Sequence, residues 1–349
     1  MTDAAAPIED LAVVDSADRD ESIGGIVLAR AGLGREVREL STVSDLRGAW
    51  AIARQWLVIA AAAGLAVWSG HWAVYLAAMV VIATRQHALG IIMHDATHYR
   101  IFTNRTVNDV VCDIFCSFPV GMTTSRYRYE HMLHHRYLNT DGDPYWVYFE
   151  EHSSWHWPKR PLEASWVFLR DLLGLNTLRN MQILWRWTPW CNHFSRRDVP
   201  PPLTLGERLR LYLFFAGVIA VLAATNGWLA FFILWMVPLP TLTMAMVRFR
   251  TIAEHLAIPN EHELNATRHV DGTLLERLSI SPLNINYHIA HHLFPSVPYY
   301  NLPKLHDILM RNEHFRRRAR ICKDYLSLEH GVLGEMLAKP DEATERVAA

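Results

Sequence analysis

The sequence predicts an all-α membrane protein, in which four transmembrane helices form two hairpins and a cytoplasmic helical cap carries the polar residues. The first observation is composition, because hydrophobic residues make up 51% of the 349 residues and charged residues only 20%. The second is that apolar residues collect in four segments, each close to the ~20 residues that cross a bilayer as a helix. The third is that each pair of segments is separated by a short turn without Lys or Arg.

Tryptophans mark the ends of the predicted transmembrane helices. The expected spans are about residues 50–68, 72–93, 209–224 and 228–247. Trp residues at or near their ends are Trp50, Trp56, Trp68, Trp72 and Trp228. Tryptophan is enriched where a membrane helix meets the water interface. This belt favours membrane helices over the alternative, a set of buried helices in a soluble protein.

Positive charge is distributed unevenly around these helices. The turns at residues 69–71 and 225–227 contain no Lys or Arg, whereas basic residues precede the first helix, fill the central stretch and follow the last helix. They include Arg30, Arg35, Arg38, Arg47, Arg126, Arg128, Arg136, Lys159, Arg160, Arg170, Arg311, Arg316, Arg317 and Arg318. Because Lys and Arg favour the cytoplasmic side, we expect both termini and the cap in the cytoplasm, in a bacterial inner membrane.

The chain divides into one membrane domain and two tails. Residues 1–30 are acidic and poor in apolar side chains, so we expect a disordered tail. Residues 31–330 form the membrane domain, and residues 331–349 form a C-terminal tail. Between Trp155 and Trp190, mixed apolar and basic residues indicate helices lying in the membrane interface, with amphipathic helices on a soluble core as the alternative. The net charge of −1 argues against a nucleic-acid partner.

Histidine is the unusual residue type, with 19 in the chain. Nine lie in four places: His94 and His98 (HxxxH), His131, His134 and His135 (HxxHH), His255 after the fourth helix, and His288, His291 and His292 (HxxHH). Residues three or four apart share one face of a helix, so each box forms a stripe of imidazoles. Three imidazoles on one helix cannot all reach one ion, and nine donors fit two neighbouring ions.

The residue types alone leave the identity of the metal open. Neutral imidazole binds zinc, copper, iron or nickel. A structural zinc needs only four ligands. The sequence lacks the Glu-x-x-His pairs of carboxylate di-iron bundles and the His-Glu-x-x-His of zinc proteases. A haem held by paired histidines would leave most of the boxes unexplained.

The order HxxxH, HxxHH, HxxHH, with a further histidine after the last membrane helix, resembles the membrane fatty-acid desaturase and hydroxylase superfamily. The run from His291 to His306 (HHLFPSVPYYNLPKLH) resembles the end of acyl-lipid desaturases, and residues 139–145 (NTDGDPY) are also similar to the family. The resemblance covers about residues 45–320. The third box begins with His288, whereas front-end desaturases have Gln at this position.

The resemblance implies that the nine histidines bind two non-haem irons, which activate O2 and remove hydrogen from an alkyl carbon. The implied ligands are His94, His98, His131, His134, His135, His255, His288, His291 and His292. The implied activity is an O2-dependent desaturase that forms a C=C bond in a fatty acyl chain or other lipid. A hydroxylase of a lipid or carotenoid stays open, as does a desaturase of a small amphipathic metabolite, of the dihydrorhizobitoxine desaturase type. From another class, a non-catalytic metal-binding membrane protein is the alternative.

The sequence has no His-Pro-Gly-Gly segment, so no fused cytochrome b5 domain is expected. Electrons would then come from an external donor, either a ferredoxin or a cytochrome b5-like protein with its reductase.

Polar residues beside the boxes are predicted to orient the ligand imidazoles through their second ring nitrogen. They are Asp95, Glu130, Glu254, Asn284 and His87. Asn284 or Glu254 could instead contribute a ligand through water, and Asp143 is either an orienting or an ordinary surface carboxylate. The histidines outside the boxes are predicted at the surface: His71, His152, His156, His193, His262, His269, His314 and His330.

Overall fold

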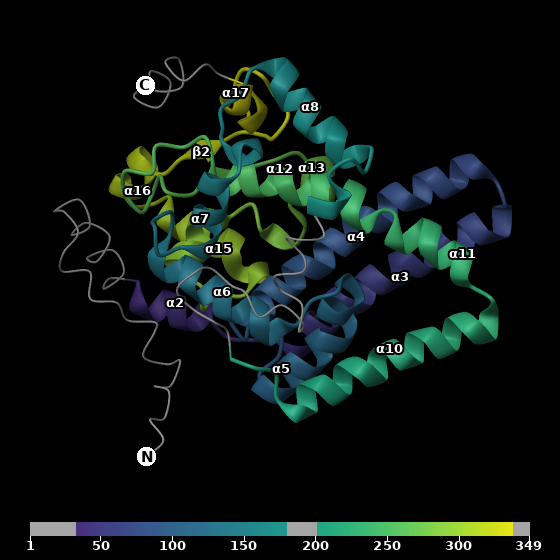
Figure 1. Cartoon of the computed structure of the whole chain (residues 1–349). Coiled ribbons are helices and arrows are strands. Elements are labelled where there is room, and N and C mark those ends of the chain that lie inside the picture. Colours follow the sequence, from purple (N-terminus) through teal and green to yellow (C-terminus); the bar gives the residue numbers. More distant parts are fainter. Residues whose placement is uncertain (1–32, 180–200, 338–349) are drawn as a thin grey trace.

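The computed structural model describes residues 33–179 and 201–337 (Figure 1). Within these ranges the chain is almost wholly helical, and its only strands, β1 (His269–Val270) and β2 (Ile321–Cys322), form a short parallel pair. The predicted all-α class is confirmed. The predicted acidic tail, residues 1–30, lies outside the described residues, as do residues 338–349.

The first hairpin consists of α3 (Asp45–Ser69) and α4 (Trp72–Thr97). Gly70 ends α3 in a left-handed conformation with φ of 65°, which glycine adopts without a Cβ penalty. The side chain of His71 accepts a hydrogen bond from the backbone N–H of Ala73 and caps the start of α4. A tight turn therefore reverses the chain between two apolar helices.

The second hairpin begins with α10 (Leu205–Thr225), which stands at the edge of the molecule in Figure 1. A capping box starts α10, because Thr204 and Glu207 satisfy each other's backbone N–H groups. The return helix comprises α11 (Trp228–Phe231), the π-helical turns η6 (Phe232–Met236) and η7 (Leu239–Thr243), and α12 (Met244–His255). Pro238 and Pro240 lack a backbone donor, and the regular helical ladder gives way to π-helical turns around them.

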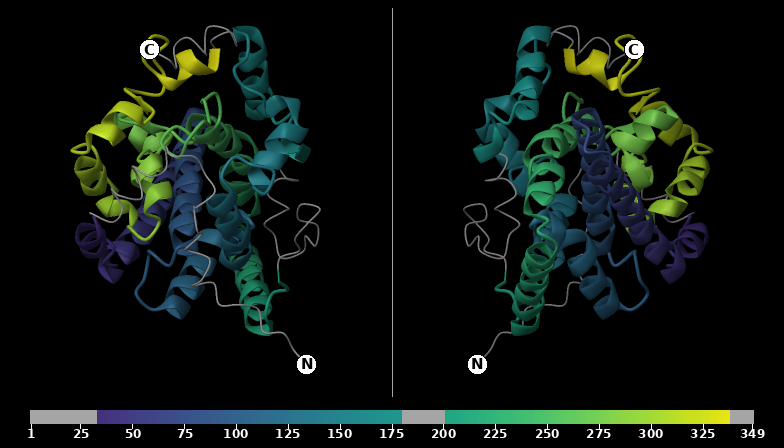
Figure 2. Two further views of the ribbon diagram at one scale, coloured as in Figure 1. Left: turned by 90° about the vertical axis from the view of Figure 1, so that its left-hand side faces the viewer. Right: turned by 90° about the vertical axis from the view of Figure 1, so that its right-hand side faces the viewer.

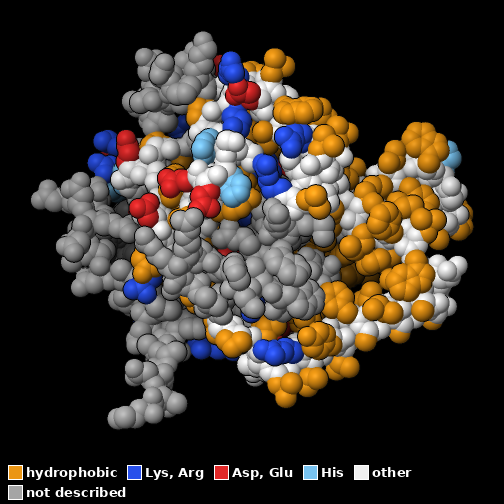
Figure 3. Space-filling view, in the orientation of Figure 1, with side chains coloured by type: hydrophobic (Ala, Val, Ile, Leu, Met, Phe, Trp, Pro, Cys, Tyr) orange, Lys and Arg blue, Asp and Glu red, His pale blue; other side chains and the backbone are white. Residues whose placement is uncertain are grey.

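Among the described residues, four helical stretches are long and apolar enough to cross a membrane: Asp45–Ser69, Trp72–Thr97, Leu205–Thr225 and Trp228–His255. Their outer surface exposes large apolar side chains, including Trp68 at 84% and Leu213 at 71%. Figure 3 shows hydrophobic side chains covering this part of the molecule, while charged side chains gather over the cap. The chain is an integral membrane protein.

All four of these helices are longer than the predicted spans, since α10 also begins earlier, at Leu205. α3 begins at Asp45, α4 continues to Thr97, and the last helix continues to His255. The extra turns lie at the cap end of each hairpin, where they carry polar residues. The first box and His255 therefore lie on the ends of the membrane helices, within the cap.

The cap is built from short helices on either side of these helix ends. Figure 2 shows α8 (teal) and the yellow-green helices of residues 288–318 on opposite sides of the membrane helices, with the last helix close to the segment that leads into α8. The cap helices are α2 (Gly34–Leu40), α5 (Arg105–Cys112), α6 (Thr124–Tyr137), α7 (Pro144–Glu151), α8 (Pro161–Leu172), α13 (Leu274–Ser279), α14 (His288–Leu293), α15 (Leu302–Leu309), α16 (Glu313–Arg318) and α17 (Val332–Leu337). Shorter helical turns join them: η3 (Asp113–Ser117), η4 (Phe118–Val120), η5 (Ser153–Trp155), η8 (Pro282–Asn284) and η9 (Tyr299–Asn301).

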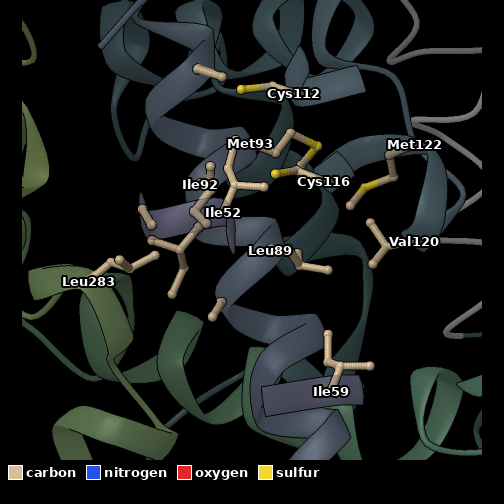
Figure 4. Close-up of a cluster of buried hydrophobic side chains, with 14 of the residues drawn as sticks. Ile52, Ile59, Leu89, Ile92, Met93, Cys112, Cys116, Val120, Met122 and Leu283 are labelled. Atoms are coloured by element: carbon tan, nitrogen blue, oxygen red, sulfur yellow. The ribbon is translucent and has the colours of Figure 1, made fainter. Parts of the chain in front are cut away.

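A buried apolar cluster surrounds α4 on the membrane side of the first histidine box. Figure 4 draws it around Leu89 and Met93, with Cys116 and Met122 on one side of the helix and Leu283 on the other. Between membrane helices, where lipid is as apolar as these side chains, such packing stabilises through van der Waals contacts. The cluster therefore fixes α4 against both the preceding cap elements and the segment that leads into the third box.

Two parts of the cap bear on the predicted domain organisation. α8 exposes Leu162 at 85% and Trp166 at 52%, within the segment for which we predict interfacial helices. Residues 180–190 of that segment lie outside the described residues, and its membrane contact stays a prediction. α17 buries Val332 and Met336, so the packed cap continues past residue 330 into the segment predicted as a tail.

Candidate metal centre

All nine box histidines meet where the membrane helices enter the cap. α4 carries His94 in its last turn and ends at His98, and α12 ends with His255. The other six come from two cap helices: His131, His134 and His135 from α6, and His288, His291 and His292 from α14. The structure therefore brings together every histidine that the resemblance implies as a ligand.

The first group consists of His94, His98, His131, His135 and His291, whose donor atoms all lie within 4.8 Å of one another. Nε2 of His131 is 3.0 Å from Nε2 of His98 and 3.1 Å from Nε2 of His135. Nε2 of His135 is also 3.2 Å from Nε2 of His291. Nε2 of His94 is buried and has no hydrogen-bond partner among the described residues. Imidazoles from three helices thus converge on one position.

The second group consists of His134, His255, His288 and His292. Donor atoms of His134, His255 and His292 lie within 4.8 Å of one another. Nε2 of His288 is 2.8 Å from Nε2 of His255 and 3.1 Å from Nε2 of His292. The groups adjoin, because the rings of His135 and His292 stack with centroids 4.2 Å apart.

Four of the imidazoles outside the membrane helices are held in their neutral form. Burial, and then the neighbouring histidines, lower the pKa of His131 and His135 well below the ordinary value. The same causes lower the pKa of His288, and they lower the pKa of His291 to about 3. A neutral imidazole has a free lone pair, which a metal ligand requires.

This donor set fits metal ions better than it fits a hydrogen-bonded cluster. A neutral imidazole offers one N–H and one lone pair. Within the groups, Nε2 atoms face one another at 2.8–3.2 Å, so several lone pairs would repel one another. A cation between them would remove that repulsion, and imidazole suits iron, zinc, copper or nickel.

A buried arginine holds the end of the helix that carries the first box. Arg128 of α6 donates to the carbonyls of Thr97 at 2.9 Å and Ala96 at 3.0 Å, and it pairs with Asp109. Its guanidinium also lies over the ring of Tyr99, 3.9 Å from the centroid. These carbonyls have no partner within the helix, so the second box helix caps the first.

A second buried arginine does the same for the helix that ends at His255. Arg268 donates to the carbonyls of Ala253, Leu256 and Ala257 and forms an ion pair with Glu335 at 2.6 Å. The C-terminal ends of α4 and α12 therefore both point at the histidines. A helix C-terminus carries partial negative charge, which favours cations at this position.

Two aspartates fix the orientation of imidazoles. Nδ1 of His134 lies 2.8 Å from Oδ2 of the fully buried Asp143, which also accepts from the backbone N–H groups of Asn139 and Tyr145. Nδ1 of His94 lies 3.3 Å from Oδ1 of Asp95. A proton on Nδ1 directed to a carboxylate leaves the Nε2 lone pair facing the group. Of the two readings of Asp143, burial favours the orienting one.

The other predicted orienting residues occupy different surroundings. Glu254 lies beside His288. Glu130 is buried immediately before His131. Burial, then Tyr127 and then the charge of Glu130 raise the pKa of Tyr145. Asn284 accepts from Arg277 and donates to the carbonyl of Tyr299, and His87 contacts the carbonyl of Ser279. For Asn284 and His87, the hydrogen bonds found therefore run to the segments flanking η8, away from the imidazoles.

Three neighbours of the histidines were not singled out from the sequence. Tyr127 stacks on His131 with centroids 5.5 Å apart, and Tyr145 packs on His134 at 4.8 Å. Arg250 forms an ion pair with Glu254 at 2.8 Å. Spacing in the sequence could have indicated two of them. Tyr127 precedes His131, and Arg250 precedes Glu254, by one helical turn.

One prediction about the remaining histidines is wrong. His269, expected at the surface, is fully buried in β1. Its Nδ1 lies 2.9 Å from the carbonyl of Asn286, and its Nε2 lies 3.0 Å from Oδ1 of Asp271. His193 lies outside the described residues.

Comparison with known proteins decides the family. The sequence model of the family described as fatty acid desaturase matches residues 70–322, which includes all nine box histidines. The chain belongs to the fatty acid desaturase family. The predicted family is confirmed, and the protein is an oxidoreductase of the desaturase type with a metal centre, a lipid or other apolar substrate and O2 as oxidant.

Individual relatives of this desaturase are moderately similar. It is 29% identical over 294 residues to dihydrorhizobitoxine desaturase of Bradyrhizobium elkanii, which covers 82% of each chain. It is 28% identical over 289 residues to the sn-1 oleoyl-lipid 12-desaturase of Anabaena variabilis, which covers 76% of this chain and 77% of the relative. It is 28% identical over 228 residues to the human sphingolipid delta(4)-desaturase/C4-monooxygenase DES2, which covers 64% and 61%.

Proposed function

We propose that the protein desaturates the alkyl chain of a fatty acyl group or membrane lipid, with two irons held by the nine histidines. The observation that supports this proposal is the pair of adjoining imidazole groups at the cap end of the two membrane hairpins. Imidazole is a common ligand of non-haem iron. The similarity to an oleoyl-lipid desaturase supports a lipid as the substrate.

The bound irons would supply the activation of O2 that allows hydrogen to be removed from an unactivated carbon. The chain's own residues would hold this centre ready. His94, His98, His131, His135 and His291 would bind one iron, and His134, His255, His288 and His292 the other. Asp143 and Asp95 would keep the Nε2 lone pairs of His134 and His94 directed inward.

The surroundings of the histidines support an apolar substrate. The buried cluster around Leu89, Ile92 and Met93 directly precedes His94 on α4. An alkyl chain entering from the bilayer would keep apolar contacts against such side chains. The same side chains would keep water from the reacting carbon.

The reaction needs electrons that the described residues do not supply. Removing two hydrogens from the substrate while reducing O2 to two waters takes two further electrons. We propose an external donor of the ferredoxin or cytochrome b5 type, which would reach the cap from the cytoplasm.

A second candidate is favoured by the relatives. The similarity to dihydrorhizobitoxine desaturase, which covers 82% of this chain, favours a small amphipathic metabolite as substrate. One relative is named both a desaturase and a monooxygenase, so hydroxylation stays with desaturation as a second outcome.

Product analysis tests the proposal. The chain would be expressed in a bacterial host that lacks its own desaturase, together with a ferredoxin and its reductase, and the lipids and polar metabolites would be analysed by mass spectrometry. Loss of two hydrogens from an acyl chain is the expected result. Gain of an oxygen, or a product only in the polar fraction, would replace the lipid desaturase with one of the other candidates.

We also propose that the centre faces the cytoplasm of a bacterial cell. The outer turns around Gly70 and Asn226 are left-handed helix ends far from the cap, and their flanks lack Lys and Arg. Reporter fusions at these two positions should read as external, and fusions after Asn139 and at the C-terminus as internal. An external signal after Asn139 would reverse the orientation.

A further inference from the structure

Glu254 differs from the other carboxylates near the histidines in the nitrogen that it approaches. Asp95 and Asp143 contact the Nδ1 atoms of His94 and His134, on the outer side of each ring. Oε2 of Glu254 instead lies 3.7 Å from Nε2 of His288, the nitrogen that faces the second group. A carboxylate that orients an imidazole from outside would not occupy this side of the ring.

The position of Glu254 satisfies the geometry of a shared ion. A carboxylate oxygen of Glu254 and the donor nitrogens of His255 and His288 all lie within 4.8 Å of one another. Donors bound to one ion at about 2.1 Å are separated by about 3–4 Å, close to the separations of 3.7 and 2.8 Å found here. Within the described chain, the second group has four imidazoles and the first has five. We propose that the Glu254 carboxylate is the fifth donor of the second group, an inference that rests on the metal centre proposed above.

Arg250 explains how a charged donor can be buried there. Its Nη1 donates to both oxygens of Glu254, at 2.8 and 3.1 Å, and Glu254 is only 3% exposed. Burying an unpaired carboxylate would be strongly unfavourable, whereas a paired carboxylate keeps free lone pairs after accepting from an arginine. An ion pair of this spacing ordinarily lies on an exposed helix surface. This one is covered by the cap and faces the imidazoles.

The consequence is that the two ions would be chemically different. The first group offers neutral nitrogen donors from the described residues, whereas the second would add one anionic oxygen. An anionic donor offsets part of the charge of the ion, and oxygen donors suit harder cations. We expect the two irons to give distinct Mössbauer spectra.

Metal content and spectra of variants test the assignment. Glu254→Gln keeps the shape of the side chain and removes its charge, whereas Glu254→Asp keeps the charge and shortens the reach. Each variant should fall from about two irons per chain to about one, with loss of one Mössbauer component, because a ligand of one ion is removed. Arg250→Lys keeps a positive charge beside the carboxylate and should retain both irons. Size-exclusion chromatography in detergent confirms that each variant is folded.

Three outcomes would overturn the assignment or its basis. If Glu254→Gln keeps two irons and the parent spectrum, Glu254 is not a donor. If Arg250→Lys loses as much iron as Glu254→Gln does, the ion pair acts structurally and the assignment also fails. If the parent chain itself holds no iron after maturation in iron-replete cells, the failure lies with the proposed metal centre.

Discussion

Two buried histidine clusters in the same cap differ in the atoms that their ring nitrogens face. In the nine-histidine centre, Nε2 atoms face other Nε2 atoms at 2.8–3.2 Å. In the second cluster, His269 and His306 stack with ring centroids 4.1 Å apart, but each nitrogen of His269 faces an oxygen. The carbonyl of Asn286 and the carboxylate of Asp271 lie 2.9 and 3.0 Å away.

The contrast shows what distinguishes a metal site from a structural histidine. Both clusters are buried and both contain stacked imidazoles. An oxygen opposite a ring nitrogen satisfies an N–H group and completes the packing, whereas several nitrogen lone pairs that converge on one position suit a cation. The atom that a buried ring nitrogen faces therefore distinguishes a metal site from a structural histidine. Burial and closeness of the rings do not.

The largest effect should come from breaking the nine-histidine centre. His134→Ala, His255→Ala and His291→Ala each remove one neutral donor and open a coordination position, so each should abolish product formation. The membrane helices do not depend on these side chains, and the variants should still insert. Product yield and membrane-fraction immunoblots measure both properties. His330→Ala, with a side chain 58% exposed, is the control and should stay within a few-fold of the parent, about 2–3-fold.

A smaller effect is expected when only the orientation of an imidazole is disturbed. Asp143→Asn keeps a good N-cap for α7 but removes the charge opposite Nδ1 of His134. Loss of such a partner typically costs about 10–100-fold in metal affinity. Competition with a metal chelator measures this affinity, and an unchanged value would mean that Asp143 serves only as a helix cap.

The structural cluster should respond in stability and not in metal content. His269→Ala removes one of the two hydrogen bonds to the carbonyl of Asn286 and the ring stacked on His306, which should lower the free energy of unfolding by about 1–3 kcal/mol. Thermal unfolding in detergent checks the stability, and elemental analysis checks the metal. A variant that is stable but lacks iron would extend the metal centre to His269 and remove the distinction between the clusters.

The smallest predicted effect is on thermal stability at acidic pH. Burial, and then His269, lower the pKa of His306 to about 4, while Asp271 acts in the opposite direction. The folded pKa lies below the unfolded value of about 6.5, so the contribution of the neutral ring is complete above pH ~6.5 and is lost as pH falls towards 4. Between pH 7 and pH 5, the melting temperature of His306→Gln should therefore fall by about 2 °C less than that of the parent. If the melting temperatures of parent and variant fell in parallel with pH, His306 would not have this role.

Much of the architecture could be predicted because its signals are local. Apolar segments of bilayer length and uncharged turns predict both hairpins, and the spacing within each box predicts a shared helical face. The extra turns of α4 and α12 could not be predicted from hydropathy. His94 and Arg248 end the apolar runs, yet both are buried and the helices continue.

The division of the histidines into groups of five and four depends on how the helices rotate against one another. Adjacent residues such as His134 and His135, or His291 and His292, contribute to different groups. Surface position was predicted for His269 because it matches no motif, but packing of β1 against α14 and α15 buries it. Arg250 and Glu254 have the spacing of an ordinary exposed pair, so only the fold reveals that both face the centre.

The donors of the two groups come from different stretches of the chain. Four of the five histidines in the first group lie between His94 and His135, whereas three of the four in the second group lie between His255 and His292. During synthesis, the first group can collect most of its donors before the second hairpin has left the ribosome. The second group cannot exist until the last box has been translated and folded back onto the first. Metal loading would then be the closing step of biogenesis, and a chain truncated before residue 288 would insert into the membrane without ever maturing.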